Sequence, residues 1–437
     1  MPSTLPEWLA YIERQHPKSI DMGLARVREV ARRMRLRKPA RKVITVGGTN
    51  GKGSTVAFIE AIVRAAGWKV GAYTSPHLLE YNERVRIDGR DVDDADLVAA
   101  FEFIEAARGD TPLTYFEYGT LAALWLFERA KLDLAILEVG LGGRLDATNL
   151  IDPDVAVITT VDLDHQDYLG NDREAIGLEK AGIARAWKPL VLGEDDPPAS
   201  VLRHAYAIGA SAVRAGCDFF FDSAGGHGNR FSPTDATLPS SGRWTWRELD
   251  GAIDLPLPRL AAPAQLRNAA AAIAALRAVG GKLPVGAIAT GVANAHVHGR
   301  LQGFQRSGVD IVVDVGHNPQ AARELAAWLA LAPACGRTFA VFAALGDKDV
   351  VGVARALEER IDGWFLAGLE AAGPRGGTVD AFAEKLQGTR AAAGARHANV
   401  GAALAAARAQ ATAGDRILVF GSFHTVAAAL RVLEQGS

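Results

Sequence analysis

Cysteine is nearly absent from this chain, which has only Cys217 and Cys335 in 437 residues. The two lie far apart, and neither belongs to a Cys-x-x-Cys motif or has a histidine at zinc-ligand spacing. Both a disulfide framework and a structural zinc site need such groupings, so the sequence argues against each. This scarcity fits a reducing compartment, and we expect a cytoplasmic protein.

Long apolar runs, an export signal and a strong net charge are also missing. The hydrophobic fraction of 49% owes much to alanine, and the run at 269–275 is bounded by Arg267, Asn268 and Arg277, so no membrane span is predicted. The first residues show neither a basic segment nor an apolar core, and nothing there suggests export. A net charge of -2 gives no reason to expect a nucleic-acid partner.

One stretch near the N-terminus is strongly basic. We interpret it as the solvated face of a helix and the loop that follows, with attraction of an anionic ligand as the alternative. Its basic residues are Arg26, Arg28, Arg32, Arg33, Arg35, Arg37, Lys38, Arg41 and Lys42.

Apolar strand-like runs alternate with helical stretches, which predicts an α/β protein with a mostly parallel sheet covered by helices. The first cycle has strands at 43–46, 69–73, 132–139, 155–161 and 190–193, and helices at 55–66, 97–107, 115–130 and 174–185. Aromatic and polar segments at 218–257 predict antiparallel hairpins, after which a helix returns at 264–279.

A second, smaller α/β cycle follows, with strands predicted at 309–314, 339–345, 364–366 and 417–420. Chains of this length usually exceed a single core, so two domains are expected. The helical pattern gives way near 293–300, and we place the boundary there, with domains at 1–296 and 297–437.

The most informative segment is the β-branched run that leads into Gly47-Gly48-Thr49-Asn50-Gly51-Lys52-Gly53-Ser54. Its glycines let backbone N–H groups face an anion, the helix that begins near Ser54 adds its positive end, and Lys52 adds a charge for phosphate. The common G-x-x-x-x-G-K-[ST] motif is missed at both ends, by Val46 and by Gly53, which leaves Ser54 in doubt as a Mg²⁺ ligand. A Gly-rich turn with an exposed lysine is the alternative.

A carboxylate ends another apolar strand, where Glu138 precedes a second Gly-rich segment. Ligands collect at the carboxyl ends of parallel strands, and a buried acid without a partner is costly, so a cation is predicted beside Glu138. An ion pair with Arg144 is the alternative.

Three further residues carry weaker signals. His165 follows the next strand and is either a metal ligand or an ordinary surface histidine. Ser75 offers a hydroxyl at a turn and, taken alone, is an ordinary loop residue. Lys180, on a helix, is by itself a surface charge or the partner of Glu179 or Glu174.

Together these motifs resemble the folylpolyglutamate synthases of the Mur ligase superfamily. The resemblance rests on residues 48–54, 75–78, 137–149, 179–183 and 314–319, and it runs in order along nearly the whole chain. Residues 113–118 and 421–426 resemble the bacterial bifunctional dihydrofolate synthase/folylpolyglutamate synthases. The two Gly-rich motifs are the most specific of these matches.

The resemblance implies an ATP-dependent amide ligase with a P-loop ATPase domain at 1–296 and a Rossmann-like glutamate-ligase domain at 297–437. It would add L-glutamate to dihydropteroate and to the γ-carboxylate of reduced folates through an acyl phosphate. The resemblance also favours a monomer.

By the same resemblance, Ser75, Glu138 and His165 would bind Mg²⁺, and Lys180 would be carbamylated and help to hold a second Mg²⁺. The expected catalytic residues are Lys52, Glu138, His165 and Lys180. The expected ATP contacts are Thr49, Asn50, Gly51, Lys52, Gly53, Ser54, Asn268, Arg300 and Asp314.

The expected pteroate contacts form three segments, Ile20, Asp21 and Met22, then Thr114, Tyr115 and Phe116, then Leu145, Asp146 and Ala147. His317 and Ser422 are expected to contact the γ-phosphate or glutamate. The chain departs from the family pattern in two places, with His298-Gly299-Arg300 for Pro-Gly-Arg and Asp314-Val315-Gly316-His317 for Asp-x-Ala-His.

Other functions remain open from the sequence. One is a Mur-type ligase that acts on a cell-wall nucleotide peptide. A nucleotide-dependent switch would need the base-reading Asn-Lys-x-Asp, and the nearest string here is Gly346-Asp347-Lys348-Asp349. A non-catalytic nucleotide-binding scaffold is harder to reconcile with Lys52, Glu138 and His165 all being present.

Overall fold

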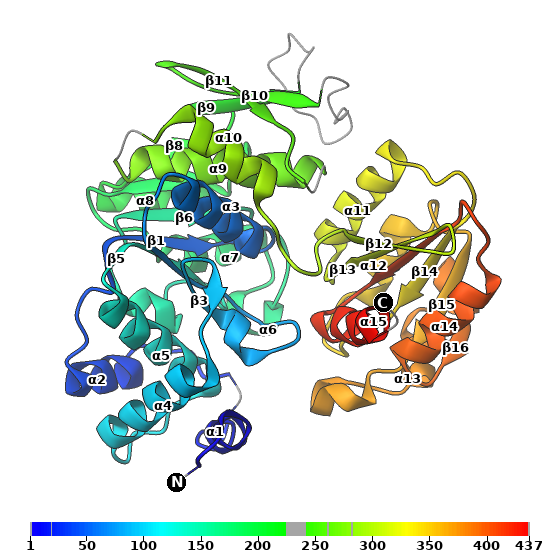
Figure 1. Cartoon of the computed structure of the whole chain (residues 1–437), viewed down its shortest axis with the longest axis horizontal. Coiled ribbons are helices and arrows are strands. Elements are labelled where there is room, and N and C mark those ends of the chain that lie inside the picture. The colour runs from blue at the N-terminus through cyan, green and yellow to red at the C-terminus, as the bar shows by residue number, and fades with distance from the viewer. Residues whose placement is uncertain (1, 19, 224–241, 260–261, 281–282, 436–437) are drawn as a thin grey trace. The chain divides into compact units, whose positions relative to one another are not determined.

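The computed structural model describes residues 2–18, 20–223, 242–259, 262–280 and 283–435 (Figure 1). They form two compact units that succeed one another in the chain between His296 and Val297. Within the described ranges, no helix combines the length and the apolar character needed to cross a bilayer.

The first unit is built on an eight-stranded sheet in the order β4-β3-β2-β5-β1-β6-β7-β8. From β2 to β8 in this order the neighbouring strands are parallel, whereas β3 and β4 pair antiparallel at one edge. The strands are β1 (Ala40–Gly47), β2 (Val70–Tyr73), β3 (Val85–Ile87), β4 (Arg90–Asp91), β5 (Leu132–Glu138), β6 (Val155–Ile158), β7 (Pro189–Leu192) and β8 (Ser211–Arg214).

Helices cover both faces of this sheet (Figure 1). One face packs against α3 (Lys52–Ala65), α9 (Pro263–Ala278) and α10 (Val285–Asn294), together with an antiparallel sheet of β9 (Phe219–Ser223), β10 (Arg243–Glu248) and β11 (Gly251–Pro256). The other face packs against α1 (Leu5–Ile12), α2 (Ala25–Met34), α4 (Asp94–Arg108), α5 (Tyr115–Ala130), α7 (Arg173–Ala181) and α8 (Ala199–Ile208). Short turns lie at α6 (Gln166–Leu169), η1 (Tyr81–Arg84) and η2 (Ala147–Leu150).

Burial on both faces explains why the central strands are almost continuously apolar. In β1, Ile44 and Val46 pack in the core with α3 and α9, whereas Val43, the residue before Ile44, packs in the core with α2, α4 and α5. Successive side chains of a strand point to opposite faces, so both faces of a doubly covered sheet need apolar residues.

The second unit has a six-stranded sheet in the order β12-β13-β17-β14-β15-β16, parallel except for β12. Phe342 and Phe420 stack at its centre with ring centroids 4.7 Å apart. The strands are β12 (Gln302–Arg306), β13 (Val309–Asp314), β14 (Thr338–Phe342), β15 (Gly363–Ala367), β16 (Ala395–His397) and β17 (Arg416–Phe420). The helices are α11 (Pro319–Leu331), α12 (Val350–Leu357), α13 (Val379–Lys385), α14 (Val400–Gln410) and α15 (Phe423–Gln435), with short turns η3 (Glu370–Arg375) and η4 (Arg390–Ala393).

The predicted α/β class is confirmed, and every predicted strand and helix is present within a few residues of its expected range. Several ends are wrong by three or four residues. The strands expected to reach Val161 and Leu345 stop at Ile158 and Phe342, and the helix expected to reach Arg185 stops at Ala181. The helices expected to begin at Thr55 and Leu97 begin at Lys52 and Asp94. The hairpins expected at 218–257 are β9 to β11, although residues 224–241 of that range lie outside the described residues.

The basic stretch is a solvated surface, with one exception. All of its other arginines and lysines are exposed, but Arg26 is only partly so. Its guanidinium pairs with Asp21 at 2.5 Å and with Glu117 at 3.2 Å. The interpretation of Arg26 as a solvated residue is therefore wrong.

The crossing of α3 and α10 depends on a glycine. A Cβ at Gly291 would overlap the backbone of Ile62, whereas one at the exposed Gly286 of the same helix would meet nothing within 4 Å. We expect Gly291→Ala to lower the free energy of unfolding by about 2 kcal/mol, because helix backbones cannot move apart cheaply in a packed core. Gly286→Ala should leave stability unchanged or raise it by up to about 1 kcal/mol. Urea unfolding measures both, and equal stabilities would contradict this account.

Candidate functional site

A tight loop joins β1 to α3 at the centre of the first sheet. It depends on Gly48, with φ 143°, and Gly51, with φ 86°, values that favour glycine. A Cβ at Gly48 would overlap the Thr159 hydroxyl, and one at Gly51 would overlap the side-chain oxygen of Asn268. Because Gly51 caps α3 without any side chain, no N-cap side chain competes with an anion at the start of the helix.

The segment after β6 forms one wall of this loop. Thr49 donates its backbone N–H to the Thr160 carbonyl at 2.7 Å and its hydroxyl to the Asp162 carbonyl at 3.0 Å. Asn50 donates its N–H to the Thr160 hydroxyl at 3.2 Å. The strand predicted to continue to Val161 stops early because this segment pairs with the loop.

Two lysines converge on one carbonyl oxygen of the loop. The Nζ of Lys52 lies 3.1 Å from the oxygens of Gly48 and Thr49, and the Nζ of Lys180 lies 3.0 Å from that of Gly48. Lys180 is 4% exposed, so the idea that it is a surface charge is wrong. Burial, and then the charge of Lys52, lower the pKa of Lys180 to about 7, while Asp164 acts in the opposite direction.

Glu138 ends β5 beside the same loop. It is 4% exposed and accepts the backbone N–H of Ser75 at 3.1 Å. A Cβ at Gly53 would lie 3.7 Å from its carboxylate. Arg144 pairs instead with Glu179 at 2.8 Å, so the suggested pair between Glu138 and Arg144 is wrong.

His165 lies in the loop between β6 and α6. It adopts the left-handed conformation with φ 52°, donates its backbone N–H to Asp164 at 2.9 Å, and keeps its ring nitrogen 4.0 Å from the same carboxylate. Across the described part of the chain, no group of three His, Cys, Asp or Glu side chains is placed to hold a metal ion. The predicted metal ligands include two residues of those types, Glu138 and His165. The other two predicted ligands are Ser75 and Lys180.

The three segments expected to bind the acceptor lie side by side. Arg26 links Asp21 to Glu117 in the first turn of α5. A Cβ at Gly142 would lie 3.3 Å from the end of Met22, and one at Gly140 would lie 2.6 Å from the Phe116 ring. These contacts bring residues 20–22, 114–116 and 140–147 together.

Two of the expected acceptor contacts already use their polar atoms within the protein. The Thr114 hydroxyl accepts the Glu117 N–H at 3.2 Å and caps α5. The carboxylate of Asp146 accepts the N–H groups of Gly140, Leu141 and Thr148 and the Thr148 hydroxyl, at 2.6 to 3.0 Å. Both side chains shape this part of the site by fixing its backbone.

In the second unit, the predicted ATP contacts Arg300 and Asp314 lie near one another, with 3.9 Å between guanidinium and carboxylate. Asp314 is buried, which raises its pKa, and it accepts the N–H groups of Leu301 at 3.0 Å and Gly316 at 2.7 Å. His317 keeps Nδ1 3.0 Å from the Val315 carbonyl. The Ser422 hydroxyl lies 2.6 Å from that of Thr425 at the start of α15.

Comparisons with known proteins identify the family of this chain. Residues 46–276 match the Mur ligase middle domain, and residues 299–423 match the Mur ligase glutamate ligase domain. The chain is 46% identical over 433 residues to the dihydrofolate synthase/folylpolyglutamate synthase of Escherichia coli, covering 99% of this chain and 96% of that one. The chain belongs to the dihydrofolate synthase/folylpolyglutamate synthase family of Mur ligases.

Solved structures of this family have the same fold. Escherichia coli FolC in complex with DHPP and ADP matches with a TM-score of 0.90 and 45% identity over the whole of both chains. A bifunctional folylpolyglutamate synthase/dihydrofolate synthase with Mn, AMPPNP and L-glutamate bound matches with a TM-score of 0.88 and 44% identity, covering 99% of this chain and 98% of that one.

Sequence reasoning missed Glu194 in this family member. The residue lies two positions after the end of β7, at the same edge of the sheet as Glu138, and is largely buried. It accepts the backbone N–H of Val161 at 3.0 Å. Val161 belongs to the segment that lines the loop between β1 and α3, which we call the phosphate loop. The rule that singled out Glu138, an acid at the end of an apolar strand, also applies to Glu194.

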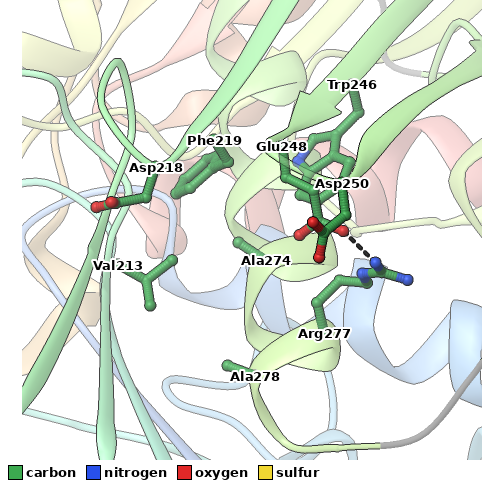
Figure 2. A pocket seen from close by; sticks show the side chains of 9 residues that line it. All are labelled: Val213, Asp218, Phe219, Trp246, Glu248, Asp250, Ala274, Arg277 and Ala278. Carbon is green, nitrogen blue, oxygen red and sulfur yellow. Dashed lines mark hydrogen bonds and ion pairs between the residues drawn. The ribbon is translucent and has the colours of Figure 1, made fainter.

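A cavity of about 440 Å³ lies elsewhere in the first unit, between α9 and the antiparallel sheet (Figure 2). Its aromatic residues, Phe219 and Trp246, are each only 1% exposed. Arg277, on its wall, pairs with Glu248. Since it offers little aromatic surface and its cation is neutralised, we place the functional site at the phosphate loop of this ligase.

The contact between Gly51 and Asn268 can be tested with a matched glycine pair. Gly51 and Gly67 both have positive φ, 86° and 82°, but nothing lies within 4 Å of a Cβ at Gly67. We expect each alanine variant to lose roughly 1 kcal/mol of stability from backbone strain. Only Gly51→Ala should also weaken nucleotide binding, by about tenfold or more, because it displaces Asn268 and the loop. Titration with a fluorescent ATP analogue measures this, and equal affinities for the two variants would contradict it.

Proposed function

We propose that this chain joins L-glutamate, with hydrolysis of ATP to ADP and phosphate, to dihydropteroate and to the γ-carboxylate of reduced folates. The observation that carries the proposal is the meeting of two lysines, Lys52 and Lys180, and the buried Glu138 around a glycine loop at the end of β1. That arrangement suits a polyphosphate. The bifunctional relative with bound AMPPNP and L-glutamate supports the choice of co-substrates.

The reaction must first activate a carboxylate, which is a poor acyl donor. We infer that the acceptor's carboxylate oxygen attacks the γ-phosphorus of ATP, forming an acyl phosphate and releasing ADP. The α-amine of glutamate then attacks the acyl carbon, the C–O bond to phosphate breaks, and the amine loses a proton. One amide forms for each ATP cleaved.

The chain's own groups offset the negative charges that meet in the first step. Lys52 and the first N–H groups of α3 would hold the β- and γ-phosphates. Asn268, beside Gly51, would contact the nucleotide in the first unit. Arg300 and Asp314 stay our predicted nucleotide contacts in the second unit. Residues 1–296 would thus bind ATP, and residues 297–437, with His317 and Ser422, would bring glutamate to the acyl phosphate.

A divalent cation fits the donors beside the loop. Carboxylate, hydroxyl and imidazole are all Mg²⁺ or Mn²⁺ ligands, and Ser75 and Glu138 are already joined through a hydrogen bond. We propose that Ser75, Glu138 and His165 hold Mg²⁺, which would neutralise phosphate charge and polarise the γ-phosphoryl group. A second Mg²⁺ would need a further anionic ligand, and a carbamate on Lys180 would supply one.

The acceptor would lie among residues 20–22, 114–116 and 145–147. Phe116 and Met22 offer apolar surfaces for a pterin or aminobenzoate ring. Because Thr114 and Asp146 are engaged within the protein, backbone groups of these segments are left to recognise polar atoms of the acceptor. A monomer without a nucleic-acid partner stays our prediction.

The decisive experiment measures ADP formation that depends on L-glutamate, first with dihydropteroate and then with a reduced folate. We expect both acceptors to stimulate it. Response to only one acceptor would limit the activity to that half, and response to UDP-linked peptides instead would identify a cell-wall ligase. Nucleotide binding without any turnover would favour a scaffold.

In the same assay, Lys52→Ala should lower turnover by at least about 100-fold, the scale of losing one preorganised charge contact. Lys42→Ala, an exposed lysine at the other end of β1, is the matched control and should keep near-normal activity. Near-normal turnover in the Lys52 variant would contradict its role.

The depressed pKa of Lys180 leads to a prediction about carbon dioxide. Only the neutral amine can attack CO₂, and with a pKa of about 7 roughly half of the side chain is neutral at pH 7, falling to about one tenth at pH 6. Activity in CO₂-depleted buffer should therefore fall, be restored by bicarbonate, and need more bicarbonate at pH 6 than at pH 8. A ¹³C carbamate signal after ¹³C-bicarbonate addition should appear in the wild type and be absent in Lys180→Ala. Bicarbonate-independent activity at both pH values, without that signal, would rule out carbamylation.

A further inference from the structure

The backbone between β6 and α6 is held from two directions. β6 lies between β1 and β7 in the sheet, so the residues that follow these two strands flank the residues that follow β6. On the β1 side, Thr49 and Asn50 of the phosphate loop bind Thr160 and Asp162. On the β7 side, the hydrogen bonds come from side chains and not from the backbone of a neighbouring segment.

Those side chains are Glu194 and Arg173, and they bind both backbone polar groups of Val161. Glu194 accepts the Val161 N–H at 3.0 Å, and the Nε of Arg173 donates to the Val161 carbonyl at 2.9 Å. The two side chains also pair with one another at 3.3 Å. Arg173 additionally donates to the carbonyl of Asp196 at 2.9 Å, which ties it to the chain beyond β7.

This pair lies among elements that carry other predicted site residues. Arg173 begins α7, which carries Lys180. Glu194 is within electrostatic reach of Arg267, the neighbour of Asn268 on α9, and of Lys180. Burial raises the pKa of Glu194 to about 7, while Arg173, the Val161 N–H and Arg267 lower it. Burying a carboxylate costs free energy, which makes Glu194 a candidate for a functional, positioning role.

We propose that Glu194 and Arg173 form a positioning pair that fixes residues 160–165 against the phosphate loop and thereby sets the geometry for ATP and its divalent cation. Thr160 touches the loop directly, and His165 lies five residues further along the same segment. The inference rests on the proposed function for its kinetic readout. Loss of the pair should weaken nucleotide and metal binding more than it slows the saturated enzyme.

The test compares Glu194→Ala, Glu194→Gln and Arg173→Ala with the wild type. Glu194→Ala should raise the KM for MgATP by about tenfold or more and change kcat by less than about threefold, since small displacements of positioning groups have effects of this size or larger. Glu194→Gln keeps an oxygen for the Val161 N–H and should recover a large part of the lost affinity. The effects of the two alanine substitutions should be less than additive in the Glu194/Arg173 double variant, because both side chains hold the backbone of Val161 and pair with one another.

Glu174→Gln is the matched control. Glu174 is the next residue on α7 and also accepts backbone N–H groups, from Ala199 at 2.9 Å and Ser200 at 2.6 Å, but these belong to α8. The KM of the Glu174→Gln variant for MgATP should equal that of the wild type. An equal rise in this control would show that general loosening of α7, rather than the pair, sets the affinity.

Direct titration with a fluorescent ATP analogue, with and without Mg²⁺, separates this inference from the proposed function. If the wild type binds the analogue but forms no ADP with any folate acceptor, the proposed function fails while the affinity comparison still stands. An unchanged affinity in Glu194→Ala and Arg173→Ala would overturn the positioning role. If Glu194→Ala does not fold, an unchanged affinity in both Glu194→Gln and Arg173→Ala would overturn it equally.

Discussion

The first unit depends on two ammonium groups held against one carbonyl oxygen. Lys52 and Lys180 both donate to the Gly48 carbonyl, in a loop where a Cβ at Gly48 would overlap Thr159 and one at Gly51 would overlap Asn268. Like charges at this separation in a buried site repel, and the repulsion together with burial lowers the pKa of Lys180. Such a site favours a ligand with several negative charges, because that ligand would offset the repulsion between the two ammonium groups.

Parallel topology explains why the other charged groups are in the same place. β1, β5, β6 and β7 are consecutive or near neighbours in the sheet, and their carboxyl ends lead to Gly48, Glu138, Thr160 and Glu194. Each strand can place one functional residue at the carboxyl edge of the sheet, while its apolar residues remain in the cores on the two faces. The acids near the lysines partly offset their charge, so the site is strongly polar but not uniformly positive.

The sequence predicted this edge well, because a strand that ends in glycines or an acid is a local pattern. It could not predict the surroundings of Lys180, since the burial of a helical residue depends on what packs against that helix. For the same reason Arg144 was open to a pairing with Glu138, although folding places Glu179 nearer. The early end of β6 also depends on tertiary contacts, because Val161 pairs with side chains that come from residues 173 and 194.

The acceptor segments illustrate a different limit of sequence reasoning. Motif resemblance marks Thr114 and Asp146 as part of that region, and the structure does bring the segments together. Yet the Thr114 hydroxyl caps a helix and the Asp146 carboxylate takes four hydrogen bonds from its own loop. A residue can therefore belong to a binding motif because it fixes the backbone there. Arg26, which belongs to none of the expected contact segments, also holds this region together by pairing with Asp21 and with Glu117, the residue after Phe116. Rigid walls of this kind reduce the entropy that a site loses when it orders around a ligand.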